Sequence, residues 1–204
     1  MFRKTAVLVT LSTVLTLLSA TAQVAPNAQK IAAVAGGTIK EAKASWWGFN
    51  PKDSTAALQA AIDSGVPKLI VEKMAGPWIV TPITLVSDQE IVFEEGVVVL
   101  AKRGEFKGGN DSLFKASGKK NITLRGYGAT WRMWRDDYAN PDLYSKAEWR
   151  MCLALGGCTN IKVLGLTLAE SGGDGIYLGV GANWATNKDI LIKDVTCDKN
   201  YRQG

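Results

Sequence analysis

The chain has 204 residues, of which 24 are Lys or Arg and 19 are Asp or Glu, so its net charge is +5. It contains no His, which excludes a Ser-His-Asp or Cys-His catalytic centre and a His-ligated metal site within this sequence. The positive charges are scattered rather than gathered into one stripe, which argues against nucleic acid as a partner.

The first residues predict export. Arg3 and Lys4 precede an apolar run, residues 6–18, and the small residues that follow end in an A-x-A pair suited to signal peptidase. The run is shorter than the roughly 20 residues that a membrane helix needs, although a retained anchor is the alternative. We expect residues 1–22 to be a signal peptide. The mature protein would then be a secreted or periplasmic monomer of net charge +3, without membrane contact.

Strand and turn patterns dominate the rest of the chain after a short leader and one helix. Residues 23–44 are Ala-rich with few large apolar groups, and we expect a poorly ordered leader. A helix is predicted over residues 56–63, where Asp53 or Ser54 can cap it. Residues 45–204 are long enough for one domain with a single core.

Three cysteines are an odd number for an oxidising compartment. Cys152 and Cys158 could close a small loop by a disulfide. Cys197 occupies an inward strand position and is expected to be a small core residue.

A repeat is the most informative feature of the sequence. Residues 121–129, 160–168 and 189–197 each begin with Asn or Asp, have apolar residues at the second, fourth, seventh and ninth positions, and bend at the sixth. A looser copy lies at residues 90–99. The last two copies are 29 residues apart and the first two are 39 apart, which fits one coil with an inserted loop. Such a period predicts a solenoid, because sandwich hairpins with tight turns would not repeat this unit.

Stacking the copies gives an all-β, right-handed parallel β-helix whose like residues form interior columns. The predicted columns are Ile122, Ile161 and Ile190; Leu124, Val163 and Ile192; and Tyr127, Leu166 and Val195. Asn121, Asn160 and Asp189 should line up at a turn and hydrogen-bond along the stack. The sequence stops where the next strand would begin, so we expect a β-helix that is truncated at its C-terminus.

Two stretches resemble the pectin-lyase-like right-handed β-helix proteins, which include polygalacturonase-like and pectate-lyase-like proteins. Residues 53–63 resemble the helix that plugs the N-terminal end of the solenoid in that family. Residues 68–85 resemble the family's first coil, and the likeness extends from about Trp46 to Gly204. Because this fold hosts lyases, hydrolases, epimerases and adhesins, the resemblance is specific for fold and weak for activity.

A second resemblance concerns chemistry. Residues 171–177 resemble the Asn-Thr-Asp-Gly stretch of polygalacturonase-like hydrolases, whose Asp is a catalytic acid, and this implies that role for Asp174. The sequence departs from the pattern, since Ser171 and two glycines replace Asn-Thr, and residues 201–203 replace a paired Asp-Asp. Alternatively, Asp174 bonds to its own backbone in an ordinary turn.

Hydrolysis and elimination make different demands on neighbouring residues. A glycosidase needs two carboxylates, and Glu170 is the nearest second candidate to Asp174. Lys199 and Arg202 fall one coil further on. They could neutralise a uronate carboxylate or, in a lyase, act as the base. The alternative is that they lie on a solvated turn.

The insertion at residues 131–149 is rich in aromatic residues beside charged ones. Aromatic faces stack on sugar rings, so the insertion is a candidate binding wall. The alternative is that these aromatics pin the loop to its own coil. The candidate substrate-binding residues are Trp131, Trp134, Arg135, Tyr138 and Trp149, with Arg132 and Tyr144 beside them.

These observations predict an exported polysaccharide-degrading enzyme, either a glycoside hydrolase or a polysaccharide lyase, that acts in a groove along the β-helix. The alternative is a non-catalytic carbohydrate-binding or surface-associated β-helix protein. The expected partner is a polysaccharide. No cofactor or metal is expected, although Ca²⁺ is possible for a polyuronate substrate. Part of the active site could lie beyond Gly204.

Overall fold

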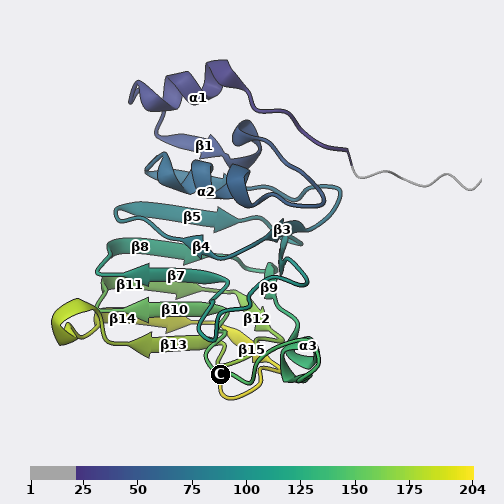
Figure 1. The fold of residues 1–204 in the computed structure, drawn as a ribbon. Helices are drawn as coiled ribbons and strands as arrows, with labels where there is room; N and C mark the ends of the chain where they lie inside the picture. The colour runs from purple at the N-terminus through teal and green to yellow at the C-terminus, as the bar shows by residue number, and fades with distance from the viewer. Residues whose placement is uncertain (1–21) are drawn as a thin grey trace, which may run out of the picture.

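The computed structural model describes residues 22–204, so nearly all of the expected signal peptide lies outside the described residues. The strands stack in three parallel sheets that wind around one core (Figure 1). The six-stranded sheet has the order β1 (Glu41–Lys43), β2 (Lys68–Val71), β5 (Gln89–Phe93), β8 (Lys120–Arg125), β11 (Thr159–Leu164) and β14 (Lys188–Lys193). Within the described residues, no helix is long and apolar enough to cross a bilayer.

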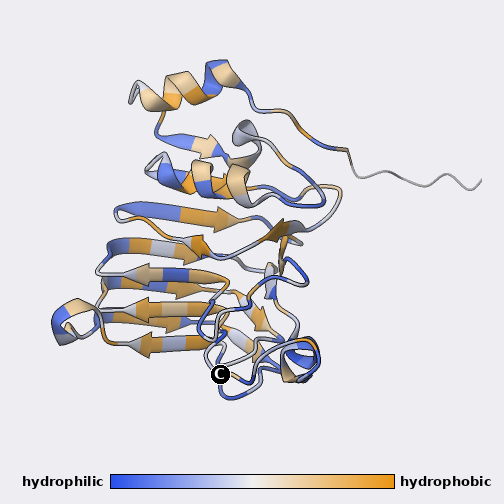
Figure 2. Ribbon diagram, in the orientation of Figure 1, coloured by the Kyte–Doolittle hydropathy of each residue, from blue (hydrophilic) through white to orange (hydrophobic). Residues whose placement is uncertain are grey.

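The other two sheets complete each coil. The four-stranded sheet has the order β4 (Ile83–Thr84), β7 (Phe114–Ser117), β10 (Leu153–Gly156) and β13 (Ile176–Gly179). The five-stranded sheet has the order β3 (Trp78–Val80), β6 (Val98–Ala101), β9 (Thr130–Arg132), β12 (Thr167–Ala169) and β15 (Thr196–Asp198). Buried and less buried residues alternate along strands such as β2, β5 and β7. Figure 2 shows apolar and polar residues mixed along the strands accordingly. The predicted right-handed parallel β-helix is confirmed.

The strand register confirms two of the three predicted columns. Ile161 pairs with Ile122 on one side and with Ile190 on the other. Val163 likewise pairs with Leu124 and Ile192. Like residues of successive coils therefore lie directly above one another, and those before the last coil are fully buried.

The third column was wrong at Tyr127. Thr167 pairs with Thr130, so Leu166 lies level with Ala129 rather than with Tyr127. The bend after β8 is two residues longer than the later bends, which moves Tyr127 onto the surface, where it is 49% exposed. Its hydroxyl donates to Oδ2 of Asp194 at 2.8 Å. A pattern aligned without a gap could not show this insertion.

The predicted turn ladder forms at Asn121 and Asn160 and extends to Asp88, whereas Asp189 lies at the equivalent turn without a hydrogen bond to the ladder among the described residues. Nδ2 of Asn160 donates to Oδ1 of Asn121 at 2.8 Å, and Nδ2 of Asn121 donates to Oδ1 of Asp88 at 2.6 Å. These residues and Asp189 have φ angles between 55° and 62°, the left-handed region that Asn and Asp tolerate best among residues with a side chain. The turn thus explains why each repeat begins with Asn or Asp.

Helix α2 (Thr55–Asp63) covers the N-terminal end of the core, as predicted, and α1 (Ala28–Ala35) and β1 lie beyond it (Figure 1). Its residues Leu58, Ala61 and Ile62 are fully buried. Of the two candidate caps, Asp53 serves, because its Oδ1 accepts a hydrogen bond from the Thr55 backbone N–H at 2.9 Å. Its Oδ2 also pairs with Nζ of Lys102 at 2.8 Å, which ties the helix to a later coil.

The expectation of a poorly ordered leader over residues 23–44 was wrong. These residues form α1 (Ala28–Ala35) and β1, which extends the six-stranded sheet beside β2. The 3-10 helix η1 (Ala44–Trp47) packs against α1, and Lys30 lies 4.7 Å from the ring of Trp46. The Ala-rich segment folds because two tryptophans and the open end of the sheet give it a surface to cover.

The three cysteines are free thiols. Cys152 and Cys158 lie at opposite ends of β10 and are both fully buried, so the small disulfide loop does not form. Burial raises the pKa of the Cys152 thiol well above its ordinary value. Cys197 is partly buried and packs against the core, as expected for a small core residue in the last coil.

Candidate functional site

Two hollows on the outer face of the four-stranded sheet form one continuous groove, because both are lined by Asn110, Ala154 and Tyr177. The larger hollow has a volume of about 800 Å³ and the smaller about 390 Å³. Ala154 and Tyr177 point outward from β10 and β13. We call this feature the sheet groove.

Two loops form one wall of the sheet groove. Residues 102–113 join β6 to β7, and residues 133–152 join β9 to β10 and include the short helix α3 (Arg135–Ala139). Both leave the same edge of the sheet because both precede a strand of it. The coil pattern predicts where these loops leave the sheet, but it does not predict how long they are.

Arg150, which the sequence analysis did not single out, holds the two loops together. Its side chain is fully buried, and its Nε donates to the carbonyl oxygen of Phe106 at 2.8 Å. Its guanidinium lies 5.4 Å from the ring of Tyr138 and 5.3 Å from the ring of Tyr144, a pair of cation–π contacts. The groove wall is therefore fixed by a buried cation.

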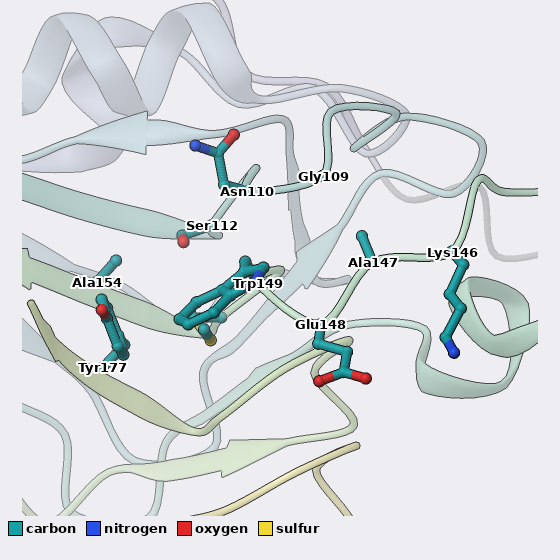
Figure 3. Close-up of a pocket in the computed structure, with 10 residues that line it drawn as sticks. Gly109, Asn110, Ser112, Lys146, Ala147, Glu148, Trp149, Ala154 and Tyr177 are labelled. Carbon is teal, nitrogen blue, oxygen red and sulfur yellow. The ribbon is translucent and has the colours of Figure 1, made fainter.

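An aromatic pair lies on the groove surface. Trp149 is 45% exposed and Tyr177 is 36% exposed. Their ring centroids are 5.3 Å apart at an interplanar angle of 81°. In Figure 3, Trp149 lies between Tyr177 and Glu148. Exposed aromatic faces of this kind can stack on sugar rings.

One guanidinium joins two carboxylates next to this aromatic pair. Nη1 of Arg202 lies 3.8 Å from Oε2 of Glu148, and its Nε lies 3.6 Å from Oδ1 of Asp174. Its Cζ lies 5.0 Å from the ring centroid of Trp149. Because both contacts are made by one planar group, the two carboxylate oxygens are at most about 10 Å apart.

Asp174 and Arg202 meet as the 29-residue offset predicted. Asp174 is 7% exposed, and its Oδ1 also accepts a hydrogen bond from the backbone N–H of Gln203 at 3.1 Å. Its Oδ2 makes no hydrogen bond to any described residue. One oxygen of Asp174 is thus held by the next coil and the other remains available.

The second carboxylate is not the predicted one. Glu170 faces Arg132, with 3.6 Å between Oε1 and Nε, and lines a different hollow on the five-stranded sheet. Glu148, which lies in the long insertion, takes its place beside Arg202. One sequence feature points to Glu148, because it is a carboxylate directly before an aromatic residue in the insertion. No repeat aligns with that position.

The structure does not bring Lys199 to the groove. It lies exposed at the turn after β15, with a φ of 51°. It is not a lining residue of the groove and makes no ion pair with the described residues. The predicted cluster of Asp174, Glu170, Lys199 and Arg202 therefore reduces to Asp174 and Arg202, joined by Glu148.

The aromatic insertion serves mainly to anchor itself. Trp131 is fully buried and stacks on Phe114 with ring centroids 4.0 Å apart, so its prediction as a substrate-binding residue was wrong. Tyr138 and Tyr144 are also buried and pack edge to face at 4.9 Å, which is the alternative of a pinned loop. These side chains are inward because the insertion continues the core of its own coil.

The remaining candidates of the insertion divide between surfaces. Trp149 lies in the groove, whereas Trp134 lines the hollow on the five-stranded sheet. Arg135 pairs with its neighbour Asp136 at 3.2 Å. One insertion thus supplies two tryptophans to two separate hollows.

Basic side chains outnumber acidic ones along the sheet groove. Lys115, Lys119 and Lys146 line it, and Glu148 is its one lining carboxylate among the described residues. Such a surface attracts an acidic polymer. Within residues 22–204, no cluster of three Cys, Asp or Glu side chains could hold a metal ion.

No family model matches the chain, and no curated protein matches it. Several solved structures do, and two of them illustrate the likeness. One is a protein from Parabacteroides merdae classed provisionally as a glycosyl hydrolase, with a TM-score of 0.60 and 19% identity over 79% of this chain and 76% of that chain. The other is an iota-carrageenase in complex with iota-carrageenan fragments, with a TM-score of 0.63 and 18% identity over 78% of this chain and 36% of that chain. At these identities the likeness is one of fold, and neither structure is described as pectin-lyase-like.

Proposed function

We propose that the chain is part of an exported glycoside hydrolase that binds an acidic polysaccharide in the sheet groove. The observation that carries this proposal is the contact of Glu148 and Asp174 with one guanidinium, beside the exposed ring of Trp149. Glycosidases place two carboxylates roughly 5 to 9.5 Å apart around the scissile bond, and the bound of about 10 Å includes this range. The two structural neighbours support the same class of activity.

Each residue has a distinct proposed role. Glu148 lies in the groove with 45% of its side chain exposed, so it can reach a glycosidic oxygen and protonate it. Asp174 is held by Gln203 and Arg202, and its free Oδ2 can accept a proton from a water molecule. Trp149 and Tyr177 would carry the sugar ring, and the groove lysines would face the acidic groups of the polymer.

A polysaccharide lyase is the second candidate. Lys115, Lys119 and Lys146 favour it, because cations can neutralise the carboxylate next to the proton that a lyase removes. Arg202, the predicted base, is instead engaged with two carboxylates and a tryptophan ring. That arrangement favours hydrolysis.

The test is a screen of the protein against iota- and kappa-carrageenan, polygalacturonate and alginate. Hydrolysis releases reducing ends without absorbance of unsaturated products, whereas a lyase gives both. Glu148→Gln and Asp174→Asn should each lower turnover at least a hundredfold, and Asp142→Asn, an exposed carboxylate of the same loop, should not. Thermal unfolding should be unchanged by Glu148→Gln.

Three results would contradict the proposal. Full activity of Glu148→Gln would remove the carboxylate pair from the chemistry. A large loss of stability in Asp174→Asn would mark Asp174 as structural. Binding of a polymer without any cleavage would favour the alternative of a non-catalytic carbohydrate-binding protein. Export has its own test, since the N-terminus of the protein recovered from the periplasm or medium should begin near Gln23.

A further inference from the structure

A second hollow lies on the outer face of the five-stranded sheet, away from the sheet groove. Its volume is about 430 Å³, and it shares no lining residue with the groove. Val98 and Leu100 of β6 form an apolar floor, and Trp134, Arg132, Glu170 and Lys73 lie around it. We call it the Trp134 hollow. Its volume falls within the range of small-ligand sites.

The ring of Trp134 is fixed before any ligand arrives. Its Nε1 donates to the carbonyl oxygen of Ala101 at 2.6 Å. Arg103 lies 4.8 Å from the ring centroid and is itself held by two hydrogen bonds to Asp137, at 2.6 and 2.7 Å. Arg103 does not line the hollow, so the part of the Trp134 ring that faces the hollow stays uncovered. A rigid aromatic surface costs little ordering entropy when it binds.

Arg132 and Glu170 supply hydrogen-bonding groups next to this ring. Their closest atoms, Nε and Oε1, are 3.6 Å apart, and the side chains are 48% and 32% exposed. Neither side chain makes a hydrogen bond to another described residue. The guanidinium donors and carboxylate acceptors are thus both free to meet hydroxyl groups.

The backbone of Glu170 adds an independent observation. Its φ is 56°, a conformation that suits Gly or Asn and that costs a residue such as Glu free energy. The turn itself repeats one coil later at Lys199, with a φ of 51°. The fold therefore requires the turn but not a glutamate in it.

We propose that the Trp134 hollow is a second, non-catalytic carbohydrate site that binds an uncharged pyranose unit of a glycan chain. An aromatic face accepts the apolar face of a sugar ring, and the Arg–Glu pair accepts and donates hydrogen bonds to its hydroxyls. Glu170 offsets the charge of Arg132 and would repel a uronate or sulfate group placed on the pair, and Lys73 is the one further charged residue among the described residues that line the hollow. This site stands apart from the proposed function, because no groove residue takes part in it.

The test uses neutral hexasaccharides of glucose, mannose, xylose and agarose type, titrated into the protein with ¹⁵N-labelled tryptophan. The indole signal of Trp134, identified by its absence in Trp134→Phe, should shift with at least one of them. Calorimetry should show at least a tenfold loss of affinity in Trp134→Ala and in Glu170→Gly. Trp149→Ala should leave the affinity of this site unchanged, because Trp149 lies in the groove.

Glu170→Gly also separates binding from folding. Gly relieves the positive φ, so this variant should melt at the same or a higher temperature than the wild type while it loses the sugar. Asp189→Gly, at another turn with a φ of 55°, is the matched control and should keep the sugar. The proposal is overturned if no hexasaccharide shifts the Trp134 signal, or if Trp134→Ala and Glu170→Gly both bind like the wild type. A loss confined to Trp149→Ala would place the sugar in the groove.

Discussion

Two tryptophans of the same insertion should respond in opposite ways to truncation. Trp131 is fully buried, with ring centroids 4.0 Å from Phe114 and 5.2 Å from Phe93. Trp149 is 45% exposed and lies in the sheet groove. The sequence predicts both as substrate-binding residues. Truncating each in turn therefore tests which side chain belongs to the core.

The magnitude for Trp131→Ala follows from its burial. A buried tryptophan removes about 200 Å² from water, which at about 25 cal/mol per Å² corresponds to roughly 5 kcal/mol. Measured Trp→Ala losses are about 3 to 5 kcal/mol. The indole N–H of Trp131 has no hydrogen-bond partner among the described residues, and relief of that group lowers the net loss. We expect about 4 kcal/mol, or a fall in Tm of about 10 °C.

Urea unfolding followed by circular dichroism measures these losses. Trp131→Phe keeps the ring stack and removes the unpaired N–H, so it should cost less than half of the alanine value. Trp149→Ala should change the free energy of unfolding by less than about 1 kcal/mol, while it weakens binding of the polymer. A loss in Trp149→Ala as large as that in Trp131→Ala would refute the assignment of core and groove.

Three further outcomes are expected. The hydrogen bonds from Arg103 hold the pKa of Asp137 below its usual range, so the wild type should be more stable than Asp137→Asn at pH 6. This advantage should shrink as the pH falls below the ordinary pKa of an Asp and vanish once the folded state is also protonated, and urea midpoints measured from pH 6 downward test it. Gly165→Ala should lose about 1 to 2 kcal/mol in the same assay, because φ is 72° and the new Cβ would lie 2.5 Å from the ring of Tyr127, and an unchanged midpoint would contradict this. The buried thiol of Cys152 should react with a thiol reagent only after unfolding, as shown by mass spectrometry of its peptide, and rapid labelling of the native protein would be inconsistent with its position.

The sequence predicts the solenoid well because its information is periodic. Each copy of the repeat carries an inward row of apolar residues and an Asn or Asp at the ladder turn. Both features would have to be misaligned before a coil was placed in the wrong register. The offset of 39 residues predicted the pairing of Ile122 with Ile161. The same periodic reading failed at Tyr127, where two inserted residues change the register.

The leader was mispredicted for a different reason. Its composition is poor in large apolar residues, and composition measures only what a segment can bury by itself. Residues 28–35 instead cover a surface that Trp46 and Trp47 provide, and β1 uses the hydrogen-bonding edge of β2. A parallel β-helix leaves such an edge at its end, and a short polar strand can satisfy it.

The candidate site was predicted only where it obeys the repeat. Asp174 and Arg202 belong to equivalent turns, so the 29-residue offset brings them together. Glu148 belongs to an insertion that no other coil contains, and a position without a counterpart cannot be placed by stacking. The insertion also shows why an aromatic cluster is weak evidence for binding, since the same residue type anchors the loop at Trp131 and faces solvent at Trp149.

The division of the insertion between two faces has a consequence for how the solenoid could hold a polymer. The sheet groove is lined by Glu148 and three lysines, whereas the Trp134 hollow lies on another sheet and is lined by Lys73, Arg132 and Glu170. Residues 133–152 connect the two, because Trp134 begins the insertion and Trp149 lies near its end. The buried anchor of Tyr138, Tyr144 and Arg150 fixes the loop that carries both tryptophans. Loosening that anchor should therefore weaken both sites together, whereas a substitution within either site should affect only that one.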